Sequence, residues 1–363
     1  MNLRHRVPLL LAAWLGAVGA PAPAHADNAN SAPAAISVRR EPALLIAGQS
    51  REEFRDYLNH VVEKGAAAPR PGGAAFYTSL DSNGVFSPHA NAPGDNHQDL
   101  DYLKLVQEPL VIQIGLWLSR DQLRPIAAGD YDVKIQRLHQ ALAELKRPVF
   151  LRIGYEFDGP HNRYPPEIFI QAYRVIARAM RANRDILLVW HSYAMLPTYQ
   201  ESAVADWYPG DDYVDWIGIS FFQVGNEGYH RAPNRDQVLE FARAKAKPVL
   251  IAEASAIRYT RRQKTLTGQA YWDYWYAPFF ALIESHPEIK AVSIINVDWD
   301  SQNQHRELEW GDCRLNSDPV VLKHWRARAA APYWLKADGS LYDSIRTFSG
   351  QATQTKPPAQ RQN

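Results

Sequence analysis

The sequence has a single cysteine, no excess of either charge and no apolar run long enough to cross a membrane. One cysteine, Cys313, cannot form an internal disulfide, which excludes a disulfide-stabilised scaffold, and we expect it to be a buried thiol rather than a reactive one. The 40 Lys and Arg residues balance 39 Asp and Glu residues. This balance gives no electrostatic reason to expect nucleic acid or an anionic membrane as a partner.

Several motifs of common enzyme classes are also missing. The sequence contains no G-x-G-x-x-G turn, no Walker A loop, no G-x-S-x-G elbow, no H-E-x-x-H and no C-x-x-C. The segment Asp95–Asp101 offers oxygen ligands, but it lacks the glycine and the terminal glutamate of an EF-hand loop. An acidic helix start is the favoured interpretation of this segment. We therefore expect no metal and no organic cofactor.

The first 26 residues have the pattern of a cleaved signal peptide. Arg4 and Arg6 precede a short apolar run, and Ala24-His25-Ala26 forms an A-x-A cleavage site. The run is shorter than the roughly 20 residues that span a bilayer, so no membrane insertion is expected. We expect an exported protein, periplasmic or extracellular, with a flexible segment at 27–38, one domain at 39–349 and a disordered tail at 350–363.

Aromatic residues are abundant, with 11 Trp, 18 Tyr and 12 Phe, which suits a core and a sugar-binding cleft equally well. Between the two ends, short apolar runs alternate with amphipathic stretches. The runs are mostly continuous rather than alternating, which is typical of strands covered on both faces. Eight strands are predicted: Ala43–Gln49, Ala74–Ser79, Leu110–Leu118, Val149–Tyr155, Ile186–Trp190, Val214–Phe222, Val249–Glu253 and Lys290–Val297.

Helical periodicity fills several of the gaps between these strands. Helices are predicted over Asp132–Lys146, Pro165–Arg181, Asn234–Lys245 (with Asn234 as N-cap) and Gly268–Ser285. Eight strands alternating with helices predict an α/β fold, a single-domain (β/α)8 TIM barrel. A doubly wound open sheet is the alternative, but its usual glycine-rich phosphate turn is missing after the first strand.

Two glutamates close apolar runs at the places where a barrel carries its chemistry. Glu156 follows the fourth predicted strand in LRIGYEF, and Glu253 ends the seventh in VLIAE. The carboxyl ends of barrel strands meet at one face, so these carboxyl groups should lie across its mouth from each other. Glycoside hydrolysis uses such a pair, one as the proton donor and the other as nucleophile or general base. A lone glutamate at a strand end is more often solvated or ion-paired, but two at matching heights favour catalysis.

These strand ends, together with WYPGDDYVDWIGIS (207–220) and WGDCRLNSDPVVLKHW (310–325), resemble glycoside hydrolase family 26 over roughly residues 43–336. The family comprises retaining (β/α)8 hydrolases, including β-mannanases. The resemblance implies Glu156 as acid/base and Glu253 as nucleophile. It also implies Arg152 as a buried arginine near the nucleophile and Trp299 as the floor of the sugar site. Two positions depart from the family pattern, because Tyr155 replaces a histidine and Phe222 replaces a tyrosine on the sixth strand.

Further residues are predicted to line the cleft because they follow strand ends. The complete predicted substrate-binding set is Arg152, Tyr155, Trp117, His191, Tyr193, Phe222, Asp298 and Trp299, with Asp158, His161, Arg163 and Tyr164 as additional loop residues. A tryptophan at a strand end can equally belong to the core, and His191 can be a barrel-rim histidine without a substrate role.

The predicted function is that of a secreted, retaining, monomeric glycoside hydrolase that cleaves a β-linked polysaccharide in the endo mode. The candidate substrates are a β-mannan-type polymer, a mixed-linkage glucan and a bacterial exopolysaccharide. The alternative is a non-catalytic carbohydrate-binding or polysaccharide-assembly protein on the same barrel. The two glutamates favour the enzyme, whereas Tyr155 and Phe222 favour the alternative.

Overall fold

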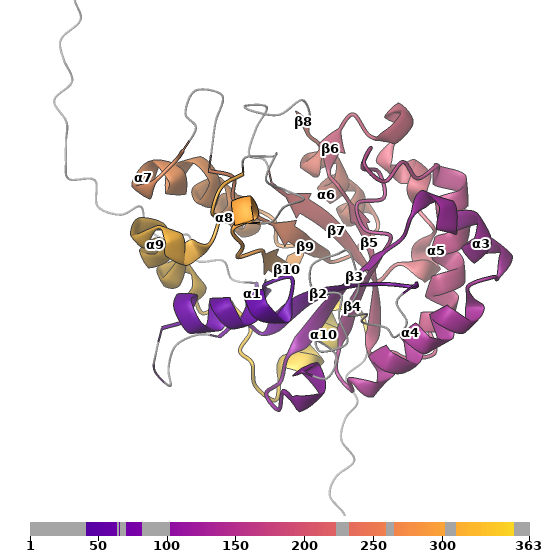
Figure 1. The fold of residues 1–363 in the computed structure, drawn as a ribbon, viewed down its shortest axis with the longest axis horizontal. Helices are drawn as coiled ribbons and strands as arrows, with labels where there is room; N and C mark the ends of the chain where they lie inside the picture. Colours follow the sequence, from indigo (N-terminus) through magenta and orange to yellow (C-terminus); the bar gives the residue numbers. More distant parts are fainter. Residues whose placement is uncertain are drawn as a thin grey trace, which may run out of the picture. The chain divides into compact units, whose positions relative to one another are not determined.

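Eight parallel strands form a closed barrel in the order β1-β10-β9-β7-β5-β4-β3-β2 (Figure 1). Their bounds are β1 Leu44–Ala47, β2 Gly73–Ser79, β3 Val111–Trp117, β4 Val149–Ile153, β5 Ile186–Ser192, β7 Trp216–Phe221, β9 Val249–Ala254 and β10 Ile289–Ile294. Each strand overlaps one predicted apolar run. The first and last strands pair directly, Leu44 beside Ala291, so the predicted barrel is confirmed and the open sheet is excluded.

The computed structural model describes residues 41–63, 65, 70–81, 102–222, 232–258, 265–301 and 310–351. The predicted signal peptide, the segment 27–38, the residues Asp95–Asp101 and the tail from 352 onward lie outside these ranges. Within them, no helix is both long and apolar enough to cross a membrane.

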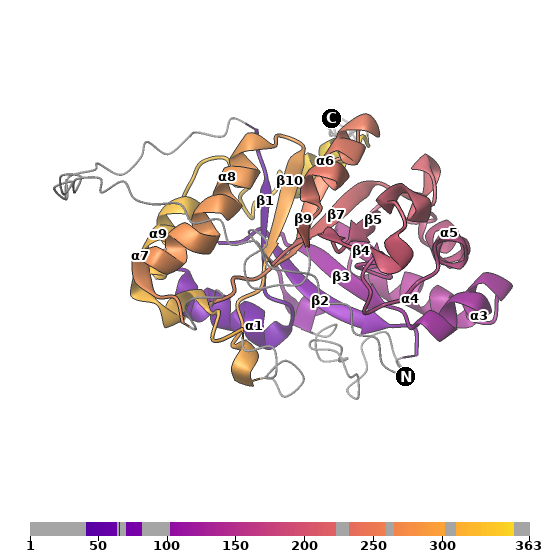
Figure 2. The same cartoon turned by 90° about the horizontal axis from the view of Figure 1, so that it is seen from above.

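Helices surround the barrel, with α7, α8 and α9 on one side and α3, α4 and α5 on another (Figure 2). The α-helices are α1 Arg51–Asp56, α3 Leu123–Ala128, α4 Asp132–Glu144, α5 Pro166–Met180, α6 Arg235–Ala244, α7 Gly268–Tyr271, α8 Ala277–Ser285, α9 Pro319–Ala329 and α10 Leu341–Phe348. The predicted helix Gly268–Ser285 is α7 and α8 joined by a π-helical turn, Trp272–Tyr276. Asn234 holds the predicted N-cap position of α6, but the expected capping was wrong, because its side chain makes no capping hydrogen bond to the helix.

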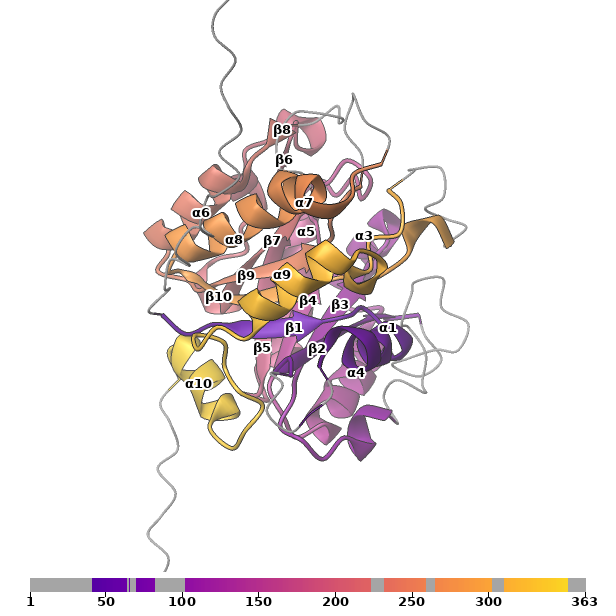
Figure 3. The same cartoon turned by 90° about the vertical axis from the view of Figure 1, so that its left-hand side faces the viewer.

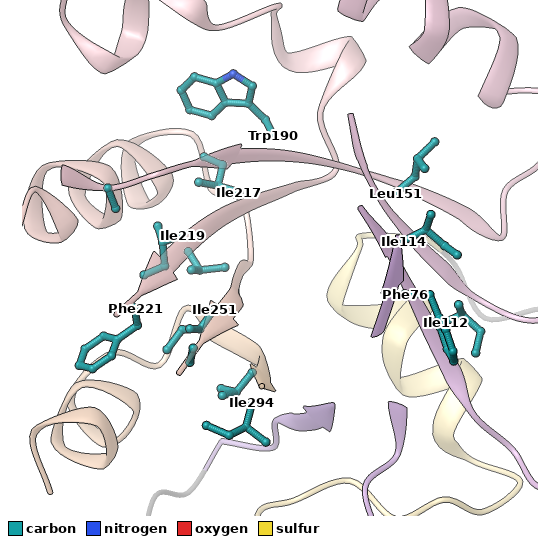
Figure 4. Close-up of a cluster of buried hydrophobic side chains, with 14 of the residues drawn as sticks. Phe76, Ile112, Ile114, Leu151, Trp190, Ile217, Ile219, Phe221, Ile251 and Ile294 are labelled. Atoms are coloured by element: carbon teal, nitrogen blue, oxygen red, sulfur yellow. The ribbon is translucent and has the colours of Figure 1, made fainter. Parts of the chain in front are cut away.

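The outward-facing strand residues pack against the helices in one continuous apolar layer. Figure 4 labels ten of these side chains, which come from β2, β3, β4, β5, β7, β9 and β10. Because the strands are buried on both faces, they need apolar residues at successive positions, which explains the continuous runs in the sequence.

A second apolar cluster fills the barrel interior and includes a helix that the sequence analysis did not predict. Leu341 and Ile345 of α10 are fully buried with Leu44, Phe150 and Trp216, which lie at the beginnings of their strands. The helix lies below β1 in Figure 3, and the Trp216 indole Nε1 donates to Ser349 Oγ at 2.8 Å. Helix α10 therefore closes the N-terminal end of the barrel.

The C-terminal end of the barrel carries a small second sheet that was not predicted from the sequence. The segments that follow β5 and β7 form a two-stranded antiparallel sheet of β6 (Met195–Leu196) and β8 (Ala232–Pro233). This end of the barrel holds the C-terminal ends of the strands, where barrel enzymes carry their active sites.

Candidate active site

A bulge in β9 turns Glu253 toward the barrel interior. Ile219 of β7 pairs with Ile251, but the register then shifts by one residue, so that Ser220 pairs with Glu253. Leu250 and Ala252 already belong to the interior cluster. In a regular strand the next residue would point outward, toward the helices. The bulge thus places Glu253 on the same face as Ser220.

The Glu253 carboxylate is bound on one oxygen by two donors. Tyr77 Oη donates to Oε1 at 2.7 Å, and Arg152 Nη1 forms an ion pair with the same oxygen. Among the described residues, none donates a hydrogen bond to Oε2 of Glu253. Burial raises the pKa of Glu253, while the Arg152 charge acts against this rise and the Glu156 carboxylate adds to it.

Arg152 is fully buried at the centre of the site. Its guanidinium lies 5.0 Å from the ring centres of both Tyr77 and Tyr155. Gly115 of β3 makes room for it, because a Cβ atom there would lie 2.7 Å from Arg152 Nη2. Burial alone would lower the pKa of Arg152, but the Glu253 charge and hydrogen bonds outweigh this effect and hold it above its ordinary value. Arg152 is therefore a buried cation.

Glu156 lies in a tight turn just past β4, not in the strand itself. Its backbone has φ of 54°, in the left-handed region that non-glycine residues rarely occupy. Asn162 Nδ2 stabilises the turn by donating to the carbonyl oxygens of Tyr155 and Glu156, each at 2.9 Å. The Phe157 amide donates to the His191 carbonyl at 3.2 Å, which joins the turn to β5.

Both oxygens of the Glu156 carboxylate have partners. Ser220 Oγ donates to Oε1 at 2.6 Å, and His161 Nε2 lies 2.9 Å from Oε2. His161 is half exposed, and its ring packs edge-on against Tyr193 at 5.1 Å between ring centres. Burial lowers the pKa of His161, but the hydrogen bond and the charge of Glu156 outweigh it, and the net direction is upward. Ser220 thus contacts one glutamate and is paired in the sheet with the other.

His191 lies between Arg152 and Ser220. Its Nδ1 is 3.3 Å from Arg152 Nη1, and its Nε2 is 3.0 Å from Ser220 Oγ. Burial, together with the charges of Arg152 and His161, holds the pKa of His191 well below its ordinary value, so the ring is neutral. Gly218 makes room for His191, because a Cβ at 218 would lie 2.9 Å from the His191 Cβ.

The other predicted residues fall into two groups. Tyr155 lies against Arg152, Tyr193 packs against His161, and Trp117, at the end of β3, is 42% exposed. Trp299 and Phe222 belong instead to a separate buried cluster with Trp310. A hydrogen bond connects this cluster to the end of β9, because Trp299 Nε1 donates to Ser255 Oγ at 2.8 Å, two residues after Glu253.

Three predicted cleft residues have local structural contacts instead. Asp298 accepts a hydrogen bond from the Asp300 amide within its own turn, at 3.2 Å. Asp158 is buried, and its carboxylate accepts hydrogen bonds from Ser192 and the Tyr193 amide, each at 2.6 Å. Burial raises the pKa of Asp158 to about 6. Tyr164 is also buried, with its hydroxyl bonded to the Leu118 carbonyl, whereas Arg163 is exposed.

Tyr77 and Ser220 are two site residues that were not predicted from the sequence. Each lies near the C-terminal end of its strand, where every second residue faces the barrel interior. Tyr77 follows Ala75 on the interior face of β2, and Ser220 follows Trp216 on that of β7. Assigning the two faces of each strand from the alternation would have found both residues. Within the described ranges, no group of three His, Cys, Asp or Glu side chains is arranged to hold a metal.

A closed (β/α)8 barrel with two glutamates at its C-terminal mouth, joined by a buried arginine and a serine, is the architecture of a glycoside hydrolase. The model of the family described as glycosyl hydrolase family 26 matches residues 129–286, a range that includes both glutamates. This match supports membership of glycosyl hydrolase family 26, and the protein is a glycoside hydrolase.

Similar proteins are known both by sequence and by structure. A protein named beta-1,3-xylanase from Alcaligenes sp. is 28% identical over 329 residues, which cover 85% of this chain and 68% of that protein. Beta-1,3-xylanase TXYA from Vibrio sp. is also 28% identical, covering 83% and 68%. The solved β-mannanase BoMan26A from Bacteroides ovatus is 15% identical, with a TM-score of 0.54 and coverage of 84% and 93%. A Cellulomonas fimi endo-beta-1,4-mannanase is 16% identical, with a TM-score of 0.55 and coverage of 83% and 74%; both structures support the fold alone.

Proposed function

We propose that the protein is a retaining endo-hydrolase of a β-linked polysaccharide, with Glu253 as nucleophile and Glu156 as acid/base. The observation that supports this assignment best is the position of Ser220, which is paired with Glu253 across the sheet and bonded to Glu156. Ser220 therefore holds the two carboxyl groups close to each other, and double displacement needs a separation of about 5–5.5 Å between them.

The different surroundings of the two glutamates support their different roles. Arg152 is a fully buried cation, and Glu253 is the carboxylate that balances its charge. Both donors bind Glu253 Oε1, so Oε2 is the oxygen that attacks the anomeric carbon. Burial and the Glu253 charge raise the pKa of Tyr77. The Tyr77 hydroxyl therefore stays protonated and donates its hydrogen bond to Glu253.

The reaction follows in two balanced steps. In the first, Glu156 gives its proton to the glycosidic oxygen as the bond from that oxygen to the anomeric carbon breaks and the bond to Glu253 Oε2 forms. In the second, Glu156 takes a proton from water, whose oxygen attacks the same carbon and releases Glu253. Two inversions leave the configuration retained, and water is the one reactant consumed besides the polysaccharide.

For the substrate, we infer a neutral β-linked polysaccharide, with β-1,3-xylan as the first to test. The two relatives found by sequence, each covering more than four-fifths of the chain, are both named as β-1,3-xylanases. The balanced charge of the chain provides no general attraction for an anionic polymer. Trp117, exposed at the end of β3, is the aromatic surface on which a sugar ring would stack. We also propose that residues 39–349 form one domain, that residues 1–26 are a signal peptide and that the protein is a monomer.

The test is product release by the mature chain from β-1,3-xylan, β-1,4-mannan, mixed-linkage β-glucan and bacterial exopolysaccharide. Early products should be oligosaccharides, and proton NMR should show the β-anomer first. Glu253→Ala should abolish turnover, with azide restoring it on an activated aryl glycoside to give the α-glycosyl azide. Tight binding to one polymer without hydrolysis of any would favour the non-catalytic alternative. A fully active Glu253→Ala protein would refute the assignment of the nucleophile.

A further inference from the structure

An unbroken series of hydrogen bonds connects the two glutamates through three side chains. It runs from Glu253 to Arg152, from Arg152 Nη1 to His191 Nδ1 at 3.3 Å, from His191 Nε2 to Ser220 Oγ at 3.0 Å, and from Ser220 Oγ to Glu156 Oε1 at 2.6 Å. Arg152 and His191 are fully buried and Ser220 is 2% exposed. Water therefore does not compete for these bonds.

The chemistry of the groups determines the direction of every bond in this series. A guanidinium only donates, so the His191 Nδ1 that faces it must accept and carries no proton. The proton of the neutral ring is then on Nε2, which donates to Ser220 Oγ. The Ser220 hydroxyl proton is left to point at Glu156. The three bonds between Arg152 and Glu156 thus run the same way, toward Glu156, whereas Arg152 donates to Glu253 at the other end.

Two glycines allow this series to exist. A Cβ atom at Gly115 would collide with Arg152 Nη2 and with the Tyr77 ring, and a Cβ at Gly218 would collide with His191. Both glycines lie within strands, where glycine is intrinsically unfavourable, so the space they leave compensates for that cost. The site is built around the positions of Arg152 and His191.

We propose that His191 and Ser220 are positioning residues that couple the charge of Glu253 to that of Glu156. This inference rests on the proposed function. When Glu253 becomes an ester, Arg152 loses the anion that balanced it and polarises His191 more strongly. His191 in turn polarises the Ser220 hydroxyl, which strengthens its bond to Glu156 as that carboxyl becomes an anion. No proton passes along the series, and each group keeps its own.

The coupling predicts which substrates need Ser220. A leaving group such as phenol needs the proton of Glu156, whereas 2,4-dinitrophenol departs without it. Ser220→Ala should therefore lower kcat/KM about 10- to 100-fold for phenyl β-xylobioside, as expected for a lost hydrogen bond to a charged group, and leave that for the dinitrophenyl xylobioside nearly unchanged. Ser220→Thr, which keeps the hydroxyl, should retain most of the activity on both.

The matched control is Ser293→Ala on β10. Ser293 is fully buried, and its hydroxyl has no hydrogen-bond partner among the residues described. This variant should behave as the wild type on both substrates. Equal losses on both substrates for Ser220→Ala would mean a merely structural role, and no loss on either would mean no role; each result overturns the proposal.

A spectroscopic readout tests the same series without turnover. In protein labelled with ¹⁵N-histidine, His191 should carry its proton on Nε2, with Nδ1 in the chemical-shift range of an unprotonated acceptor. Glu253→Gln should shift the His191 resonances, and Ser220→Ala should move the Nε2–H signal. A proton on Nδ1, or no response to Glu253→Gln, would overturn the coupling. An enzyme inactive on every glycoside but showing these shifts would instead refute the proposed function alone.

Discussion

Replacing Arg152 by methionine tests the electrostatics of the site most directly. The Arg152 side chain is 0% exposed and that of Glu253 is 10% exposed, so the substitution leaves an uncompensated buried carboxylate. Breaking such a pair by removing one partner costs about 3–5 kcal/mol of the free energy of unfolding. Total stabilities are roughly 5–15 kcal/mol, so the expected loss is a large part of the whole.

The loss should depend on pH with a definite sign. Without Arg152, burial and the Glu156 charge raise the pKa of Glu253 unopposed, further above its value in the unfolded chain. A folded state that binds the proton more tightly is favoured at low pH, and this advantage is lost as the pH rises through the folded-state pKa. The difference between Arg152→Met and wild type should therefore be largest near pH 8. Near pH 4 it should fall to about 1–3 kcal/mol, the cost of the lost hydrogen bonds.

Urea unfolding at pH 4 and pH 8 measures this difference. The control is Arg243→Met, because Arg243 forms a 2.7 Å ion pair with Glu288 but its side chain is 51% exposed. Its loss should stay below about 1 kcal/mol at both pH values. An Arg152→Met variant that is equally destabilised at pH 4 and pH 8 would refute the reasoning. Such a result would mean that the substitution had not left a buried, charged carboxylate without its partner.

Three further substitutions separate the parts of the site. Tyr77→Phe removes one donor from Glu253 Oε1 and should lower kcat roughly 10-fold with little change in Tm, and an unchanged kcat would contradict that role. Gly218→Ala should lower the free energy of unfolding by about 1–3 kcal/mol in urea denaturation, because the new methyl group would lie 2.9 Å from His191; a neutral effect would mean that β7 can shift. Trp117→Ala should raise KM for the polymer without changing Tm, as calorimetry and initial rates would show, and an unchanged KM would exclude Trp117 from sugar binding.

The sequence predicted the barrel because the signal for its strands is local. A strand covered on both faces must be apolar at successive positions, and eight such runs with helical periodicity between them are visible without any knowledge of contacts. The end of each run also located Glu156 and Glu253. Helix α10 escaped prediction because its role, closing the barrel over Trp216, depends on packing between distant segments.

The partners of the glutamates could not be predicted in the same way. The bulge that turns Glu253 inward is a one-residue register shift between β7 and β9, and no residue type marks it. The left-handed turn at Glu156 exists because Asn162 holds its carbonyl, a contact that follows only from the folded loop. Tyr77 is 176 residues away in the chain from the Glu253 oxygen to which it donates.

By itself, then, the sequence determined the barrel and which two carboxylates stand at its mouth, because apolar strand runs and strand-end positions are properties of neighbouring residues. Only the tertiary structure decided which way those carboxylates point and what they contact. Arg152, His191 and Ser220 come from three different strands, β4, β5 and β7, and closure of the barrel is what brings them into one hydrogen-bonded series. Hydrogen bonds act over about 3 Å, so their partners are set by strand register, which pairing across the sheet determines.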